Sequence, residues 1–292
     1  MQAAASKTLS GMITLYQSGL KKAKHTILLL SLAIAGCRTQ IAPASPTPDL
    51  ASLRLLTDSA TAPLLRDLVN HYHPSGVLIS WDIEVAEAPT IVNWLKAANS
   101  SFALTSFLSN EAIAQNNLWV TPVGQDAVAF IVNTANPVAA LSAAELRAIL
   151  QGRISNWNQL GGADLPITVV ARQAESSTGA LVQSMVLGER RTTLNARLAA
   201  ANEDVLELVR SLPGALGYVS MGYVDSSIRV IPLDGIPPTP RTVSANQYPI
   251  RAPMLFVGRR PPNDDYYRAF FAWVQSPEGQ AIVRQHYGGL SS

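Results

Sequence analysis

From residue 51 onward, the sequence alternates between segments with the hydrophobic period of a β-strand and segments with the period of an α-helix. Residues 77–85 place an apolar side chain at every second position, which is typical of a half-buried strand. Residues 61–72 place their leucines on one helical face. Further strands are expected at 53–57, 102–107, 126–133, 166–171, 214–220, 229–233 and 253–258. Strands that alternate with helices form helix-covered sheets, so we predict an α/β fold with mainly parallel sheets.

Capping signals mark several helix boundaries. Ser142 and Glu145 have the spacing of a capping box, and Gly152 follows as an expected stop. Near the C-terminal end, a helix is predicted from Asp264 to Gln275 and another from Ser276 onward. With 292 residues, of which 48% are hydrophobic and 14% charged, the chain can bury a large core and is expected to form two modest domains.

The first 36 residues have the pattern of a signal peptide. A basic segment at 21–24 precedes an apolar stretch at 26–35, which is too short to span a bilayer as a helix. Small residues then lead into Cys37, the only cysteine, as in the lipobox of bacterial lipoproteins. We therefore predict a signal peptide at 1–36, lipidation at Cys37 and a flexible tether at 37–50. The protein is expected to be exported and anchored to a membrane by lipid, with translation starting at Met1 or Met12.

The basic character of the chain belongs to this leader. The formal net charge is +2 at pH 7, but four of the five lysines and no acidic residue precede position 37. Without residues 1–36, 18 basic residues stand against 20 acidic ones, which gives −2. No cluster of basic residues interleaved with aromatics remains, so nucleic acid is not expected to be a partner.

Residues 172–179, RQAESSTG, follow a predicted strand and open a predicted helix. In open α/β sheets, ligands bind beyond the carboxyl ends of strands, where helix N–H groups, hydroxyls and an arginine attract anions. Three interpretations compete: an ordinary helix cap, a nucleophile, or an anion-binding site. A cap is the commonest role of such residues, and a nucleophilic Ser176 would need a nearby base. The local sequence alone does not establish an anion-binding site at this turn.

Five segments resemble the phosphate-binding lipoproteins of bacterial ABC phosphate importers and occur in that family's order. They are VNTANPV (132–138), LQGRISNWNQLGG (150–162), PGALGYVS (213–220), YPIRAP (248–253) and SPEGQ (276–280). The resemblance implies a two-lobed clamp of the periplasmic-binding-protein type (type II), each lobe a mainly parallel sheet flanked by helices. Lobe I would comprise 51–125 plus 228–292, and lobe II would comprise 126–227.

In that family, the turn that corresponds to 172–179 runs Arg, three residues, then Ser-Gly-Thr, and it holds the anion. Arg172, Ser176 and Thr178 match this pattern, while Ser177 replaces the glycine. The resemblance thus implies ligand contacts from Arg172, which would grip two oxygens, and from Ser176, Ser177 and Thr178. It also implies phosphate or a related oxyanion as ligand and the permease subunits of an ABC transporter as partners; the chain is expected to be a monomer.

The opposite half of the implied site departs from the family. Where the family has Gly-Ser after its first strand, this chain has Asp58 and Ser59, and residues 86–90 replace a Gly-Ser-Gly segment. The place of an acceptor aspartate is assigned to Ser100 or Ser101. Asp58 has two interpretations: with Ser59 it contacts the ligand and accepts a proton from phosphate, or it caps its own helix and places a negative charge at the site.

We therefore predict a membrane-tethered solute-binding protein of an ABC importer that takes a small oxyanion, with phosphate as the expected ligand. The alternative is a paralogous sensor or structural lipoprotein whose phosphate site has changed its ligand or been lost. The sequence contains no G-x-S-x-G elbow, Walker loop or H-E-x-x-H motif, so no enzymatic activity, cofactor or metal is expected. A turn at 172–179 plugged by the protein's own side chains would count against anion binding.

Overall fold

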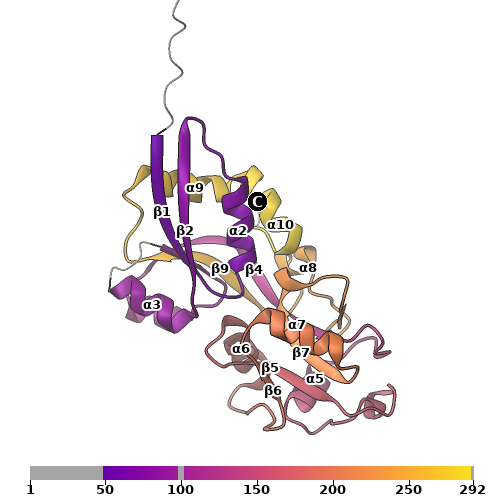
Figure 1. Cartoon of the computed structure of the whole chain (residues 1–292). Coiled ribbons are helices and arrows are strands. Elements are labelled where there is room, and N and C mark those ends of the chain that lie inside the picture. The colour runs from indigo at the N-terminus through magenta and orange to yellow at the C-terminus, as the bar shows by residue number, and fades with distance from the viewer. Residues whose placement is uncertain (1–48, 98–101, 291–292) are drawn as a thin grey trace, which may run out of the picture. The chain divides into compact units, whose positions relative to one another are not determined.

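The structure, a computed structural model, describes residues 49–97 and 102–290 (Figure 1). The predicted signal peptide at 1–36, the lipidation site Cys37 and all but the last two residues of the tether at 37–50 lie outside the described residues. Ser100 and Ser101, to which the acceptor position was assigned, also lie outside them.

The strands form one hydrogen-bonded path in the order β2-β1-β3-β9-β4-β7-β5-β6, with β8 paired to β4. Their bounds are β1 (Asp49–Thr57), β2 (Val77–Val85), β3 (Phe102–Thr105), β4 (Trp119–Val132), β5 (Thr168–Arg172), β6 (Arg197–Ala199), β7 (Ala215–Ser220), β8 (Arg229–Val230) and β9 (Arg251–Gly258). Strand β1 pairs in parallel with β2 and β3, and β5 pairs in parallel with β6 and β7. In contrast, β9 and β4 run antiparallel to their neighbours. The α/β class is confirmed, with parallel strands on both sides of an antiparallel centre.

Helices connect most of these strands. The α-helices are α2 (Ala62–His71), α3 (Ala88–Lys96), α4 (Asn110–Gln115), α5 (Ala143–Leu150), α6 (Ser177–Val182), α7 (Asn202–Ser211), α8 (Pro240–Ser244), α9 (Asp265–Gln275) and α10 (Pro277–His286). The predicted capping box of α5 is present, and Asp264 and Ser276 cap α9 and α10. Short 3₁₀ turns span Trp157–Leu160 and Met221–Tyr223. Helix α6 continues as a π-helical turn, Gln183–Leu187, where the sequence had indicated one regular helix. Among the described residues, none of the helices combines the length and the apolar character that a membrane span requires.

Strand β4 links the two parallel groups of strands. It pairs with β9 from Trp119 to Ala127 and with β7 from Val128 to Val132. The predicted lobe boundary at 125/126 falls on this strand, and the division into lobes stays a prediction. Asp126, two residues before the change of partner, is buried, and its Oδ1 accepts hydrogen bonds from the Ala127 N–H at 2.7 Å and the Ser220 hydroxyl at 2.9 Å. Burial raises the pKa of Asp126 to about 8.

The core packs on both sides of this link. Around β1 and β3, helix α9 contributes Phe270 and Phe271, and the rings of Phe102 and Phe256 pack on Phe271 with centroids 5.1 and 4.3 Å away. Around β5 and β7, helix α7 packs its apolar face on the strands beside it (Figure 1). These cores fix the ends of β1 and β5, which carry the predicted site residues.

Candidate functional site

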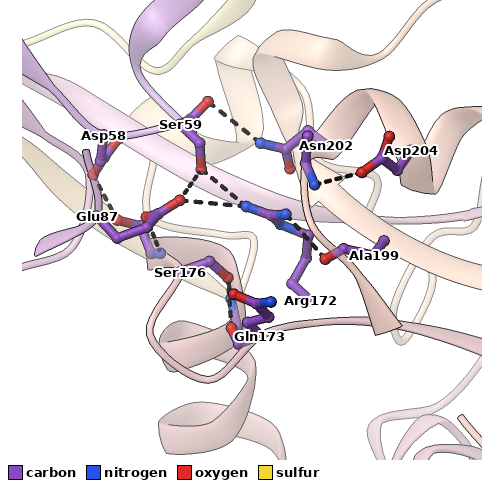
Figure 2. Close-up of polar contacts among 12 residues, drawn as sticks. Asp58, Ser59, Glu87, Arg172, Gln173, Ser176, Ala199, Asn202 and Asp204 are labelled. Carbon is purple, nitrogen blue, oxygen red and sulfur yellow. Dashed lines mark hydrogen bonds and ion pairs between the residues drawn. The ribbon is translucent and has the colours of Figure 1, made fainter. Parts of the chain in front are cut away.

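Hydrogen bonds join the turn that follows β1 to the turn that follows β5 (Figure 2). Both strands pair in parallel with their neighbours, so the loops at their carboxyl ends occupy the position where open α/β sheets bind ligands. The first turn supplies Asp58 and Ser59, and the second runs from Arg172, the last residue of β5, through Ser176, the N-cap of α6, to Thr178 in the first turn of that helix. Sequence reasoning identified both turns, and the structure brings them into direct contact.

Arg172 is the centre of this contact. Its side chain is 1% exposed. Its Nη2 donates to the Ser59 hydroxyl at 3.0 Å and to Glu87 Oε1 at 3.4 Å. Its Nη1 donates to the Ala199 carbonyl at 3.2 Å, which orients the guanidinium from the side of β6. A single guanidinium nitrogen makes the contact with Glu87, and the two-oxygen grip expected for a bound anion stays a prediction.

Glu87, the residue before α3, lies at the point where the predicted anion donors converge. Its Oε1 accepts from the Ser59 hydroxyl at 2.6 Å, and its Oε2 accepts from the Ser177 N–H at 3.3 Å. With the Arg172 contact, three donors from both turns hold one carboxylate, and Figure 2 shows it bonded to both Ser59 and Arg172. Burial is the largest cause that raises the pKa of Glu87, and the Asp58 charge adds to it, while the contacts with Ser59, Arg172 and Ser177 act in the opposite direction. The junction is thus filled by the protein's own carboxylate, which is the outcome expected to count against anion binding at this turn.

Asp58 lies beneath this cluster and is fully buried. Its Oδ1 accepts from the Thr61 N–H at 2.9 Å and the Thr61 hydroxyl at 2.7 Å, at the start of α2. Its Oδ2 accepts from the Thr105 hydroxyl at 2.8 Å, the Ser106 N–H at 2.8 Å and the Ser177 hydroxyl at 2.6 Å. Both oxygens are therefore engaged by the protein's own donors, and the role of Asp58 toward a ligand stays a prediction. Two hydroxyl residues at the end of β3, Thr105 and Ser106, therefore contact Asp58.

The three hydroxyl residues of the second turn have different roles. Ser176 is an N-cap: its Oγ accepts from the Gly179 N–H at 3.1 Å and donates to the Gln173 carbonyl at 2.7 Å. Ser177 gives its N–H to Glu87 and its hydroxyl to Asp58. The Thr178 hydroxyl is buried and has no hydrogen-bond partner among the described residues. Only Ser177 of the three contacts the opposite turn.

Two residues that sequence reasoning gave no role complete the site. Asn202, the first residue of α7, donates from Nδ2 to the Ser59 carbonyl at 3.3 Å, and the Tyr223 hydroxyl donates to the same carbonyl at 2.7 Å. Burial raises the pKa of Tyr223 to about 12, so its hydroxyl stays a donor at neutral pH. No local sequence motif marked Asn202 or Tyr223, because both reach Ser59 only through the folded arrangement of the chain. Within the described chain, Asn202 Oδ1 and Arg172 Nε are buried without a hydrogen-bond partner.

A cavity of about 370 Å³ lies beside the cluster. Ala88 and Pro89 line it from α3, and Ala174 and Ser177 line it from the second turn and α6. The cavity therefore extends from Ala88, which follows Glu87 in the sequence, to Ser177, whose N–H donates to Glu87.

Comparisons with known proteins are consistent in family and fold. The model of the PBP superfamily domain matches residues 42–278. The phosphate-binding protein PstS of Borreliella burgdorferi is 24% identical over 78% of this chain and 85% of its own length. The protein of the same name in Bacillus subtilis is 33% identical over 43% of this chain and 42% of its own length. A crystal structure with bound phosphate, described as a phosphate ABC transporter substrate-binding protein of Clostridium perfringens, superposes with a TM-score of 0.77 and 26% identity, over 82% of this chain and all of that one.

Proposed function

The chain belongs to the PBP superfamily, and on that basis we propose that it is an extracytoplasmic binding protein that captures a small oxyanion, phosphate above all, for an ABC importer. The relatives that carry phosphate in their names or structures support the ligand. The predicted lipid anchor at Cys37 would hold the protein on a membrane as a monomer, and the permease subunits of the importer would receive the solute. No chemistry is performed on the ligand.

The observation that carries this proposal is the convergence of donors from both turns on one carboxylate. Arg172 Nη2, the Ser59 hydroxyl and the Ser177 N–H all point at the Glu87 oxygens. A carboxylate presents negatively charged oxygens, as an oxyanion does, so the same donors suit a phosphate. We call Arg172, Ser59 and the Ser177 N–H the anion seat.

Buried polar atoms without partners add to this support. Among the described residues, three such atoms lie at the site. Arg172 Nε belongs to the anion seat, Thr178 Oγ1 belongs to the residue after Ser177, and Asn202 Oδ1 belongs to a residue that contacts Ser59. Buried polar groups are nearly always paired in folded proteins. A phosphate with four oxygens, one of them protonated near neutral pH, offers both acceptors and a donor to such atoms. We therefore propose Arg172, Ser59, Ser177 and Thr178 as ligand contacts, and Ser176 and Asp58 as residues that hold the two turns in place.

The test is isothermal titration calorimetry of the purified full-length protein with phosphate, sulfate, molybdate and tungstate. We expect phosphate to bind and to raise the melting temperature, because a ligand that binds only the folded state stabilises it. Absence of heat and of a thermal shift with all four anions would refute the proposal.

A second candidate function is favoured by the position of Glu87. A paralogous sensor or structural lipoprotein with a lost phosphate site would keep the two turns closed by an internal carboxylate, as observed here. In that case Arg172→Ala would leave the cellular function intact, whereas it would abolish uptake by a binding protein.

A further inference from the structure

Glu87 occupies the anion seat on which the proposed function rests. The Ser59 hydroxyl, the Ser177 N–H and Arg172 Nη2 are all engaged by its two oxygens, at 2.6, 3.3 and 3.4 Å. An oxyanion that used the same three donors would have to replace Glu87 as their acceptor. A donor hydrogen that points at one carboxylate oxygen makes only a weaker hydrogen bond to a second acceptor.

The charges around Glu87 make this competition strong. Groups from three elements face it: Arg172 at the end of β5, Ser177 at the start of α6, and Asp58 and Ser59 in the turn after β1. Farther away, Asp126 on β4 acts electrostatically with Asp58, and its pKa is raised by burial. Among the described residues, Arg172 is the only cation in an ion pair with Glu87. A phosphate that entered while Glu87 remained ionised in place would add negative charge next to two carboxylates.

Glu87 also has room to leave. Its side chain is 29% exposed, whereas that of Arg172 is 1% exposed. Glu87 has an extended backbone conformation immediately before α3, so its side chain is not locked inside a helical turn. The next residues, Ala88 and Pro89, line the cavity of about 370 Å³. Its carboxylate can therefore move without unfolding α3 or disturbing the core.

We propose that Glu87 is an internal competitor, so that an oxyanion enters the anion seat only when the Glu87 carboxylate withdraws from Arg172, Ser59 and Ser177. The inference rests on the proposed function and adds a requirement to it. Protonation favours withdrawal, because a neutral carboxyl group binds the guanidinium more weakly than a carboxylate does. Since burial raises the pKa of Glu87, this help begins at a higher pH than for an exposed glutamate.

The competing role for Glu87 is direct acceptance of a hydrogen bond from the bound oxyanion. The two roles predict opposite effects of one substitution. If Glu87 competes, Glu87→Gln removes the charge and tightens binding; if Glu87 accepts a proton from the ligand, the same substitution weakens binding. Glu87→Ala removes the side chain altogether, and it should likewise tighten binding if Glu87 competes and weaken binding if Glu87 contacts the ligand.

The experiment measures inorganic phosphate binding by calorimetry to the full-length wild type, Glu87→Gln and Glu87→Ala between about pH 5 and about pH 8. Glu189→Gln is the matched control, because it removes the same charge from an exposed residue outside both turns. At about pH 8 we expect Glu87→Gln to bind about tenfold more tightly than wild type, as when the competent fraction rises from about a tenth to nearly one. The ratio of the two dissociation constants should shrink as pH falls, because Glu87 in the wild type then becomes neutral. Phosphate's own titration cancels in this ratio.

Thermal melting gives a second readout. Without ligand, Glu87→Gln should melt below wild type, because it leaves Arg172 buried without its counterion, and phosphate should raise its melting temperature more than that of wild type. Equal or weaker phosphate binding by both Glu87 variants, with wild type binding normally, would overturn the inference and leave the proposed function standing. No phosphate binding by wild type or either variant would overturn both.

Discussion

The turn after β1 and the turn after β5 follow strands that pair in parallel, yet they carry opposite chemistry. The turn after β5 presents donors, through Arg172 and the N–H and hydroxyl of Ser177. The turn after β1 presents a buried carboxylate, Asp58, and α3 brings a second one, Glu87, to the same place. The acidic side and the basic side therefore satisfy each other.

This difference teaches that the two turns can be held together without a solute. A buried arginine is costly unless it is paired. If both turns carried only donors, an anion from solvent would have to supply that pairing. Here Glu87 supplies it at 3.4 Å, and Asn202 and Tyr223 add hydrogen bonds to the Ser59 carbonyl. Capture of a solute is then an exchange of one anion for another rather than the filling of an open site.

The largest expected effect comes from removing the basic side of the comparison. Arg172→Ala should weaken phosphate binding at least about thirtyfold, because truncating one partner of a buried charged contact costs about 2–5 kcal/mol. Calorimetry measures the loss, and Arg190→Ala, at an exposed arginine, is the control. Phosphate affinity within about threefold of wild type in Arg172→Ala would remove Arg172 from the anion seat, since such a change is under about 1 kcal/mol.

The next effect separates the two carboxylates. Asp58→Ala should lower the free energy of unfolding by about 3 kcal/mol, because it leaves the Thr61 and Ser106 N–H groups and the Ser177 hydroxyl without their acceptor. Asp58→Asn, which keeps one carbonyl oxygen, should lose less. Urea denaturation measures both. A stability of Asp58→Ala equal to that of wild type would show that Asp58 does not hold the turn.

The turn after β5 could be predicted from the sequence because its chemistry is contiguous. Arg172 to Thr178 lie within seven positions, and a strand followed by a helix places them at the carboxyl end of the sheet whatever the rest of the chain does. The α/β class was also predictable, because the alternation of strands and helices is likewise a local pattern of the sequence. Strand direction was not predictable: apolar runs such as 253–258 do not show that β9 runs antiparallel to β3 and β4.

The opposite side of the site depends on residues that are distant in sequence. Glu87, Asn202 and Tyr223 contact Ser59 across separations of 28, 143 and 164 positions. No local pattern carries such contacts, because they follow from how the sheet is assembled. Asp58 was recognised from the sequence, but donors that surround it, such as Thr105 and Ser177, come from distant segments.

A third effect concerns Asp126, the buried carboxyl group on the strand that links the two groups of strands. Its pKa is raised from 3.8 to about 8 by burial, so between these values the folded protein holds a proton that the unfolded chain has lost. Stability from this group is therefore complete below about pH 4 and is lost as pH rises through about 8. Asp126→Asn should not show this loss, so its stability relative to wild type should rise with pH, by about 1.4 kcal/mol per pH unit between the two pKa values.

Thermal melting of Asp126→Asn between about pH 5 and about pH 9 tests this expectation, with Glu189→Gln, at an exposed residue, as the control. The melting temperatures of wild type and Asp126→Asn should diverge as pH rises. Parallel curves for the two proteins over the whole range would show that Asp126 titrates like an exposed aspartate.

The smallest effect distinguishes residues within the turn after β5. Ser176→Ala should cost about 1 kcal/mol of stability, the usual value for an N-cap, and should leave phosphate affinity unchanged, because its hydroxyl is used by Gly179 and Gln173. Thr178→Val keeps the shape of a side chain whose hydroxyl has no partner among the described residues, so its stability should not fall, while its phosphate affinity should drop. Since the two substitutions each remove one hydroxyl from neighbouring positions, calorimetry and urea denaturation of the pair separate support of the turn from contact with the solute. A greater loss of affinity in Ser176→Ala than in Thr178→Val would reverse the two assignments.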